Sequence, residues 1–242
     1  MTMKRMFGIG ACMVLFASVC GCGGEGEAPA PVFLRAGDSL VLVVSGEAPP
    51  FSSFDEDTGE AKGIEIDIAR EAAARLGRRL EVRRAEFEDL LPMVKSGEAD
   101  MAASGLTITE GRLKSVDFSD SYAVDGGAFL YRTGDPTPTM IRAELMRVAT
   151  VDSMTPDFYL TRHGIDPVRY RSCAAAVKDL LNKKVDAFFY DRFSTKIEAE
   201  KSGGLLSVSQ LETRESYGIA VRKGFTALRD AINAVIAERR LR

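Results

Sequence analysis

The chain has 242 residues, which is enough for one large domain or two small ones with cores of their own. Hydrophobic residues make up 45% of it and charged residues 28%, which excludes a disordered or fibrous protein and indicates an ordinary globular one. The formal net charge is −3 with both signs scattered along the chain, so neither a basic block for nucleic acid nor an acidic tail is present.

The first residues have the pattern of an export signal. Lys4 and Arg5 precede an apolar run over 6–19, which is shorter than the about 20 residues that a membrane-spanning helix needs. The next residues, Val19-Cys20-Gly21-Cys22, resemble a bacterial lipobox, in which cleavage frees the last cysteine for acylation. We therefore predict a signal peptide over 1–21, lipidation of Cys22, and a flexible tether over 22–35. The alternative is an ordinary cleaved signal in which Cys22 has no special role.

Cysteine use agrees with this interpretation. Cys12 and Cys20 leave with the signal and Cys22 is acylated, so only Cys173 remains in the folded part. We therefore expect no intramolecular disulfide despite export, and Cys173 is expected to be a small buried hydrophobe.

From residue 40 onward, strand-like and helix-like segments alternate. The apolar periodicity predicts a strand over 40–45, a helix over 64–76, a strand over 80–84, a helix with apolar residues Phe87, Leu90, Leu91 and Val94, and a strand over 99–104. In the first helix, apolar residues recur at spacing four from Ile64, and Glu71 is placed to pair with Arg75. This β-α-β-α-β order indicates a mostly parallel sheet with helices on both faces.

The alternation restarts after a turn-rich stretch over 134–139. The second series comprises a strand over 147–151, a helix from Thr155, a helix over 177–184, a strand over 185–190, a helix over 193–201, a strand over 217–221 and a final helix over 225–236. Thr155-Pro156-Asp157 has the pattern of an N-cap, a first-turn proline and a first-turn acid. The chain therefore holds two α/β units.

Enzyme signatures are mostly absent from the sequence. It contains no His-Glu-x-x-His, Cys-x-x-Cys, Walker loop or Gly-x-Ser-x-Gly. The single histidine, His163, is expected to be solvated at a helix end, which makes a metal site or a histidine-based triad a poor interpretation. No cofactor and no metal are expected.

One segment does suggest a binding site. A predicted strand ends at Ser104, Gly105 lets another group approach the backbone, and Arg112 follows at a short helical turn. Ligands of open α/β sheets bind at the carboxyl ends of parallel strands, and a guanidinium suits a carboxylate. Taken alone, Arg112 could equally pair with Glu110 or Asp117 at the surface.

The chain resembles a known family in several motifs. These are Pro49-Pro50-Phe51, residues 63–69, residues 91–100 and residues 104–122, followed more loosely by 185–191 and 217–224. In order and spacing they are similar to the family 3 extracellular solute-binding proteins, which bind polar amino acids for ATP-driven (ABC) importers.

The resemblance implies a type II periplasmic-binding-protein-like fold of the α/β class. Each of its two lobes would hold a mostly parallel sheet flanked by helices, and two strands would form the hinge. We expect one lobe over 36–124 and 216–242, and the other over 125–215. Members of the family usually continue past the last helix with a short segment that returns to the first lobe, whereas this sequence ends at Arg242.

The resemblance also implies roles for individual residues. Arg112 would clamp the ligand α-carboxylate, helped by Thr107, by the backbone near Ser104 and Gly105, and by Thr155 from the second lobe. Asp191 would take the α-ammonium, because a zwitterion that loses its hydration needs a partner for each charge. Phe87 would provide one wall for the ligand side chain. Thr155 could also do no more than cap its helix.

Two positions depart from the family pattern. Ala48 stands where a second aromatic wall is usual, and Ser45 stands where binders of cationic ligands have an aspartate. Glu47 and Asp152 could replace that charge, or could be solvated loop residues. Phe51 is expected in the core rather than in contact with the ligand.

These features together predict an exported, periplasmic, lipid-anchored and monomeric protein that captures an amino acid and delivers it to an ABC permease, without covalent chemistry. One alternative is a periplasmic cyclohexadienyl dehydratase, which would use Asp191, Glu47 or Asp152 as an acid/base. Another is a ligand-sensing module that acts through a partner.

Overall fold

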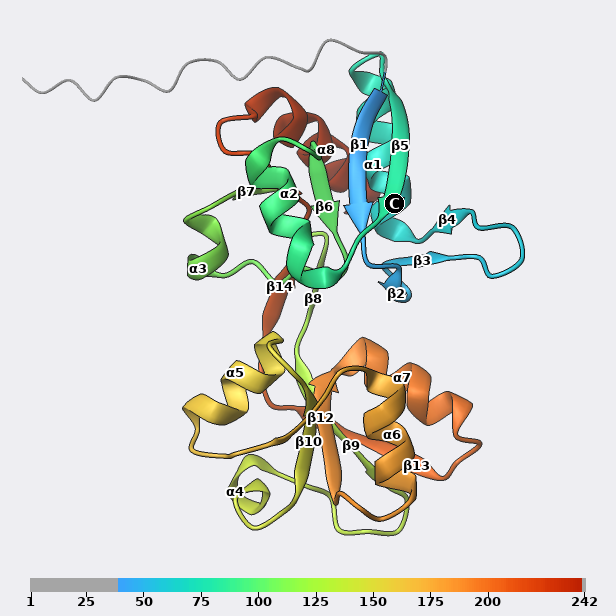
Figure 1. Cartoon of the computed structure of the whole chain (residues 1–242), viewed down its shortest axis with the longest axis vertical. Coiled ribbons are helices and arrows are strands. Elements are labelled where there is room, and N and C mark those ends of the chain that lie inside the picture. Colours follow the sequence, from blue (N-terminus) through green and yellow to red (C-terminus); the bar gives the residue numbers. More distant parts are fainter. Residues whose placement is uncertain (1–38, 241–242) are drawn as a thin grey trace, which may run out of the picture. The chain divides into compact units, whose positions relative to one another are not determined.

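A computed structural model describes residues 39–240, and its main strands form two five-stranded sheets (Figure 1). The first sheet has the order β5-β1-β6-β15-β7. Its strands are β1 (Ser39–Val44), β5 (Arg79–Arg84), β6 (Met101–Ala103), β7 (Asp117–Phe118) and β15 (Ala220–Val221). β1 pairs in parallel with β5 and β6, whereas β15 is antiparallel to β6 and β7.

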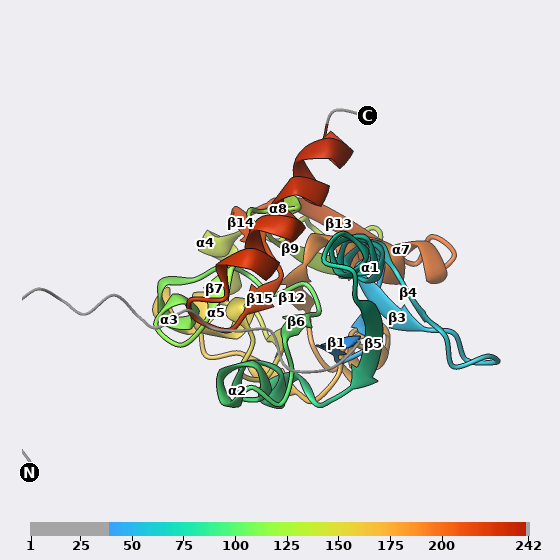
Figure 2. The same ribbon diagram turned by 90° about the horizontal axis from the view of Figure 1, so that it is seen from above.

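Helices cover both faces of this first sheet, and we call the sheet and these helices the first lobe. They are α1 (Ile64–Arg75), the 3-10 helix η1 (Phe87–Asp89), α2 (Leu90–Ser96), α3 (Glu110–Leu113) and α8 (Thr226–Arg240). α1 and α8 pack on one face, around Leu42 and Met101. α2 covers the opposite face, around Val43 and Leu90 (Figure 2).

The start of α1 depends on a glycine. Gly63 is the N-cap with φ 128°, and a Cβ there would collide with the main-chain oxygen of Phe51. The buried face of α1 is also displaced from the predicted one. Ile64 is 38% exposed, whereas Glu65 is fully buried.

Helices α1 and α8 are joined by ion pairs at their ends. Arg75 pairs with Glu238 at 2.7 Å, and Arg239 pairs with Glu71 at 2.6 Å. The predicted pair between Glu71 and Arg75 within α1 is therefore replaced by pairs to another helix, because α8 brings its own charges alongside.

A small antiparallel sheet follows β1 and was not predicted. It has the order β2-β3-β4 and comprises β2 (Glu47–Ala48), β3 (Ser52–Phe54) and β4 (Ala61–Lys62). These strands are too short to show a periodicity of two in the sequence.

The second lobe consists of the second sheet, of order β11-β10-β12-β9-β13, and its helices. The strands are β9 (Gly127–Arg132), β10 (Val148–Val151), β11 (Val168–Tyr170), β12 (Ala187–Asp191) and β13 (Leu206–Leu211). The helices are α4 (Met140–Ala143), α5 (Thr155–Arg162), α6 (Cys173–Leu181) and α7 (Arg192–Lys201). Phe129, Phe188 and Phe189 are fully buried in this lobe.

Two strands carry the chain between the lobes. β8 (Ala123–Asp125) and β14 (Glu215–Tyr217) pair antiparallel as a separate two-stranded sheet (Figure 1). The predicted strand over 217–221 is thus divided, with β14 ending at Tyr217 and β15 belonging to the first sheet. No helix within residues 39–240 is long and apolar enough to cross a membrane.

The predicted α/β class and two-lobed architecture are confirmed, but both sheets are mixed rather than mostly parallel. β10 is parallel to β11 and β12, while β9 is antiparallel to β12 and β13. Parallel neighbours need a long crossover connection. β9 and β15, the strands that directly follow the crossing strands β8 and β14, are the ones that run antiparallel to their neighbours in the two sheets.

Candidate ligand-binding site

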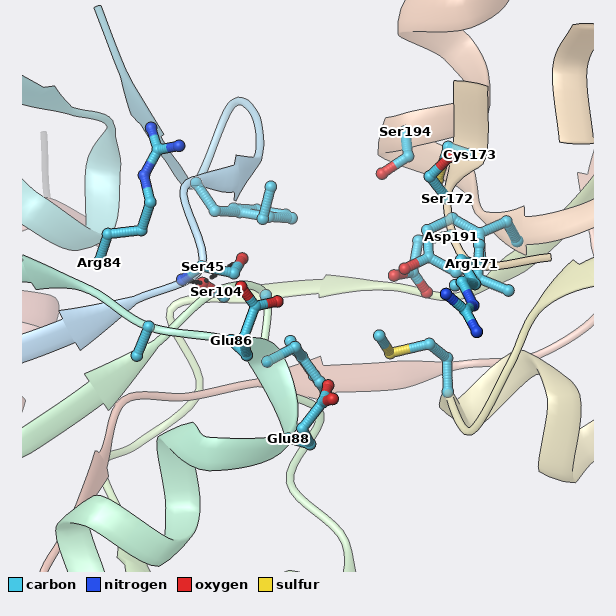
Figure 3. A pocket seen from close by; sticks show the side chains of 18 residues that line it. Ser45, Arg84, Glu86, Glu88, Ser104, Arg171, Ser172, Cys173, Asp191 and Ser194 are labelled. Carbon is cyan, nitrogen blue, oxygen red and sulfur yellow. Dashed lines mark hydrogen bonds between the residues drawn. The ribbon is translucent and has the colours of Figure 1, made fainter. Parts of the chain in front are cut away.

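A cavity of about 210 Å³ lies between the lobes and is lined by residues from both (Figure 3). Its lining includes Ser45, Phe87, Ser104 and Gly105 from the first lobe and Met154, Tyr190, Asp191 and Ser194 from the second. An adjoining recess adds Thr107, Arg112 and Thr155. The structure therefore brings together every residue predicted to bind a ligand except Glu47. The side chain of Glu47 lies outside the described part of the chain, as does Cys22.

Arg112 is held in place by its own segment. The Thr109 side chain caps α3 by accepting a hydrogen bond from the Arg112 N–H at 3.2 Å, and Arg112 Nη1 donates to the Thr107 carbonyl oxygen at 2.8 Å. The guanidinium carbon lies 5.7 Å from the centre of the Phe87 ring. Burial lowers the pKa of Arg112, and the charges of Glu215 and Asp191 oppose that shift.

The surface-pair interpretation of Arg112 does not hold. None of the ion pairs in residues 39–240 includes Arg112, and Asp117 instead faces Lys223 at 3.8 Å and accepts the Gly224 N–H. A half-buried guanidinium with N–H groups left over is suited to an anionic partner from outside the chain.

Asp191 ends β12 and stands at the N-cap position of α7, although its side chain makes no capping bond there. Burial raises the pKa of Asp191 to about 7, with a further contribution from Glu215, while the Tyr217 hydroxyl and Arg112 lower it. Its Oδ1 is buried, and no atom in the described part of the chain meets it with good hydrogen-bond geometry. A buried carboxylate in this state is stabilised by a cation.

Thr155 corrects a prediction. The N-cap of α5 is Met154, and Thr155 is the first helical residue, so its hydroxyl is not the cap. No side chain caps α5, and Asp157 in its first turn instead accepts the N–H of Ser153, which precedes the helix, at 3.0 Å. The Thr155 hydroxyl instead lies 3.4 Å from the Thr107 hydroxyl, across the boundary between the lobes.

Ser104 and Gly105 directly follow β6. The Ser104 hydroxyl oxygen accepts the Ser45 N–H at 2.8 Å and is 3.0 Å from the Ser45 hydroxyl. Gly105 has φ 62°, in the left-handed region that favours glycine, and its N–H donates to Glu65 at 3.0 Å.

Glu65 is a site residue that the sequence reasoning missed. Its Oε1 accepts both the Gly105 N–H and the Tyr122 hydroxyl, and the carboxyl group is completely buried, which raises its pKa. Glu65, which belongs to α1, therefore holds the loop after β6 in place. The available signal was an acid within the apolar run of the motif over 63–69.

The aromatic walls are incomplete, as expected. Phe87 and Ala48 both line the cavity, so one wall is a ring and the other only a methyl group. Phe51 is 6% exposed and therefore belongs to the core, and it also lines the cavity. Its ring packs against those of Tyr122, Tyr217 and Phe193.

The other residues singled out in the sequence differ in their exposure and in their position relative to the cavity. Asp152 is exposed and does not line the cavity, and Cys173 is half-buried at its edge rather than fully buried. His163 is exposed, as predicted, with Nδ1 2.8 Å from the Tyr159 carbonyl oxygen. Within residues 39–240, no group of three or more His, Cys, Asp or Glu side chains could hold a metal ion.

Comparison with known proteins identifies the family. The model of the bacterial extracellular solute-binding proteins, family 3, matches residues 40–241, so the chain belongs to this family. The chain is 29% identical to a probable histidine-binding protein of Neisseria gonorrhoeae, over 97% of this chain and 91% of the relative. It is 30% identical to an L-arginine-binding protein of Pseudomonas aeruginosa, over 83% of each.

Solved structures agree. Holo ArgBP from T. maritima is similar with a TM-score of 0.75 and 32% identity, over 84% of this chain and 91% of that one. An ancestral arginine-binding protein bound to arginine has a TM-score of 0.74 and 27% identity, over 84% and 93% of the two chains. The protein is thus a solute-binding protein of the class that serves ABC transporters, and its relatives are binding proteins rather than enzymes.

Proposed function

We propose that this protein captures an α-amino acid between its lobes and delivers it to an ABC permease. The observation that supports this most directly is that Arg112 and Asp191, of opposite charge and from different lobes, line one recess. A zwitterion with adjacent carboxylate and ammonium groups matches such a pair. In this proposal Arg112 holds the carboxylate, with Thr155, and Asp191 holds the ammonium.

The relatives support an amino acid as the ligand. The proteins that resemble this chain include binders of histidine, arginine and L-cystine. Phe87 lies where it can cover an apolar side-chain stem, and charged residues of both signs, among them Glu86 and Arg171, line the wider part of the cavity (Figure 3).

Titration calorimetry of residues 36–242 with the common amino acids and L-cystine tests this proposal. We expect at least one of them to bind with an affinity that Arg112→Ala abolishes. If none binds, or if Arg112→Ala leaves the affinity unchanged, the proposed function is wrong.

We further propose that the protein works outside the cytoplasm, anchored by lipid on Cys22. The lipobox-like pattern over 19–22 supports this, as do relatives that are periplasmic proteins. A lipid anchor would keep the binding protein close to the permease that receives its ligand.

A second function is favoured by one observation, namely a buried carboxyl group, Asp191, in the lining of the cavity, where burial raises its pKa to about 7 as suits a general acid. A dehydratase would use it on a cyclohexadienyl substrate. Incubation with prephenate and arogenate tests this alternative, since a binding protein gives no product from either compound.

A further inference from the structure

Glu215 lies where the two lobes meet, and it is not among the residues proposed to hold the ligand. It begins β14, one of the two strands that carry the chain between the lobes. Its Oε2 accepts a hydrogen bond from the Thr107 hydroxyl at 2.7 Å, and its Oε1 accepts one from the Thr213 hydroxyl at 3.1 Å. The carboxylate thus reaches the proposed ligand-binding recess from the side of the crossing strands.

This contact decides how Thr107 can meet a ligand. A hydroxyl has one proton and two lone pairs, while an ionised carboxylate only accepts. With its proton directed to Glu215, the Thr107 oxygen has only lone pairs for the recess. Its 3.4 Å contact with Thr155 must then use the Thr155 proton.

A lone pair in the recess favours one end of a zwitterion over the other. It attracts an ammonium and repels a carboxylate, and Asp191 lines the same recess. Thr107 would therefore work with Asp191 on the ammonium, which differs from the expectation that its hydroxyl helps Arg112 on the carboxylate. The Thr155 proton, which this contact directs to Thr107 in the free protein, would have to turn away from Thr107 to reach the ligand's carboxylate.

We propose that Glu215 is a positioning residue that keeps the Thr107 proton away from the recess, so that the Thr107 hydroxyl accepts from the ligand's ammonium. The inference rests on the proposed amino-acid function. The charge of Glu215 also raises the pKa of Asp191 and opposes the fall in the pKa of Arg112, which places it within electrostatic reach of both.

Two variants separate the hydrogen bond from the charge. Glu215→Gln removes the charge, but its amide oxygen can accept from Thr107 and its amide nitrogen can donate to Thr213. Glu215→Ala removes both, and the Thr107 proton can then turn toward the recess. Glu212→Ala is the matched control, because Glu212 lies in the same segment and lines neither the cavity nor the recess.

The probes are L-arginine, L-glutamine, L-histidine and L-cystine, each measured by calorimetry beside its 2-hydroxy analogue, which lacks the amine. For any of the four that binds the parent protein, we expect Glu215→Ala to reduce the preference for the amino acid over its analogue by about 10-fold or more, as for a lost hydrogen bond to a charged group. Glu215→Gln and Glu212→Ala should leave the preference within about threefold of that of the parent.

A double-mutant cycle with Thr107→Val completes the test. If Glu215 acts through Thr107, adding Glu215→Ala to Thr107→Val should change the preference little further. The inference is overturned if Glu215→Ala weakens binding of an amino acid and of its 2-hydroxy analogue equally. It is also overturned if Glu215→Gln and Glu215→Ala change the preference to the same extent, or if Glu215→Ala still changes the preference in the Thr107→Val background. A parent protein that binds none of the four amino acids would instead overturn the proposed function, and this inference with it.

Discussion

Arg112 Nη1 donates a hydrogen bond of 2.8 Å to the main-chain oxygen of Thr107. The bond uses one nitrogen of the planar guanidinium, and the ring of Phe87 faces the same group at 5.7 Å. The orientation of the fork is thereby set before a ligand arrives, which leaves its other N–H groups for a carboxylate. Little side-chain entropy then remains to be lost on binding.

This arrangement predicts that lysine cannot replace Arg112. Arg112→Lys retains the charge, but one ammonium group cannot hold the Thr107 carbonyl and also present a planar pair of donors. We expect Arg112→Lys and Arg112→Ala both to weaken amino-acid binding by about 2–5 kcal/mol, or roughly 30- to several-thousand-fold. Titration calorimetry measures the loss, and Arg70→Lys, on the exposed face of α1, is the control. Unchanged affinity in Arg112→Lys would show that Arg112 does not hold the ligand carboxylate.

The elements that the sequence predicts well are those whose signals are local. The buried strand β1 and the amphipathic helix α1 each show a periodicity within one window, and the residues of the recess fall in short motifs. The N-cap of α5 lies one residue before the predicted Thr155, because Thr155-Pro156 has the pattern of a cap while Met154 takes the non-helical backbone conformation.

The remaining site residues depend on partners far away in the chain. Glu65 accepts from Gly105, 40 residues on, and from Tyr122, 57 residues on. Glu215 accepts from Thr107, 108 residues earlier. No window of sequence contains both members of such a pair. An acid in an apolar run is visible in the sequence, but its function depends on the tertiary fold.

The burial of Glu65 predicts a difference between two substitutions. Glu65→Ala leaves the Gly105 N–H and the Tyr122 hydroxyl without their acceptor inside the protein, and each such donor costs about 1–3 kcal/mol. Glu65→Gln keeps an acceptor oxygen and removes a buried charge, so it should cost less. Urea unfolding followed by circular dichroism measures both.

Asp67→Ala, on the exposed side of the same helix, is the control for Glu65. Its pair with Arg70 is at the surface and should contribute less than about 1 kcal/mol. If Glu65→Ala is no more destabilising than Asp67→Ala, the supporting role of Glu65 is wrong.

The lipid anchor predicts the behaviour of a cysteine variant in cells. Cys22→Ser removes the acyl acceptor, so the protein should become soluble or keep its signal peptide. Cell fractionation with immunoblotting measures where the protein lies and how large it is. Cys20→Ser, two residues earlier, is the control and should remain on the membrane. Membrane retention of Cys22→Ser with normal signal cleavage would contradict the anchor.

Asp191 predicts a dependence of binding on pH. Its pKa is about 7 in the free protein, raised from 3.8 chiefly by burial, and an α-ammonium requires the ionised form. Below pH 7 the competent fraction of the protein falls about tenfold for each unit of pH, and the affinity should fall with it. The effect of rising pH on the stability of the free protein is opposite to its effect on binding. The folded state holds a proton between pH 4 and 7 that the unfolded state releases, so the free protein should lose stability as pH rises through that range.

Asp191→Asn tests both consequences while preserving the shape of the side chain. The variant should bind amino acids about 2–5 kcal/mol more weakly at pH 8, with an affinity that no longer depends on pH between 5 and 8. Its free form should gain stability relative to the parent as pH rises from 4 to 7, and binding of a 2-hydroxy acid should be nearly unaffected. Asp152→Asn, an exposed acid outside the cavity, should retain the parent's pH dependence. If the parent protein binds an amino acid equally well at pH 5 and pH 8, Asp191 does not hold the ammonium, and an anionic ligand held by Arg112 alone becomes the better interpretation.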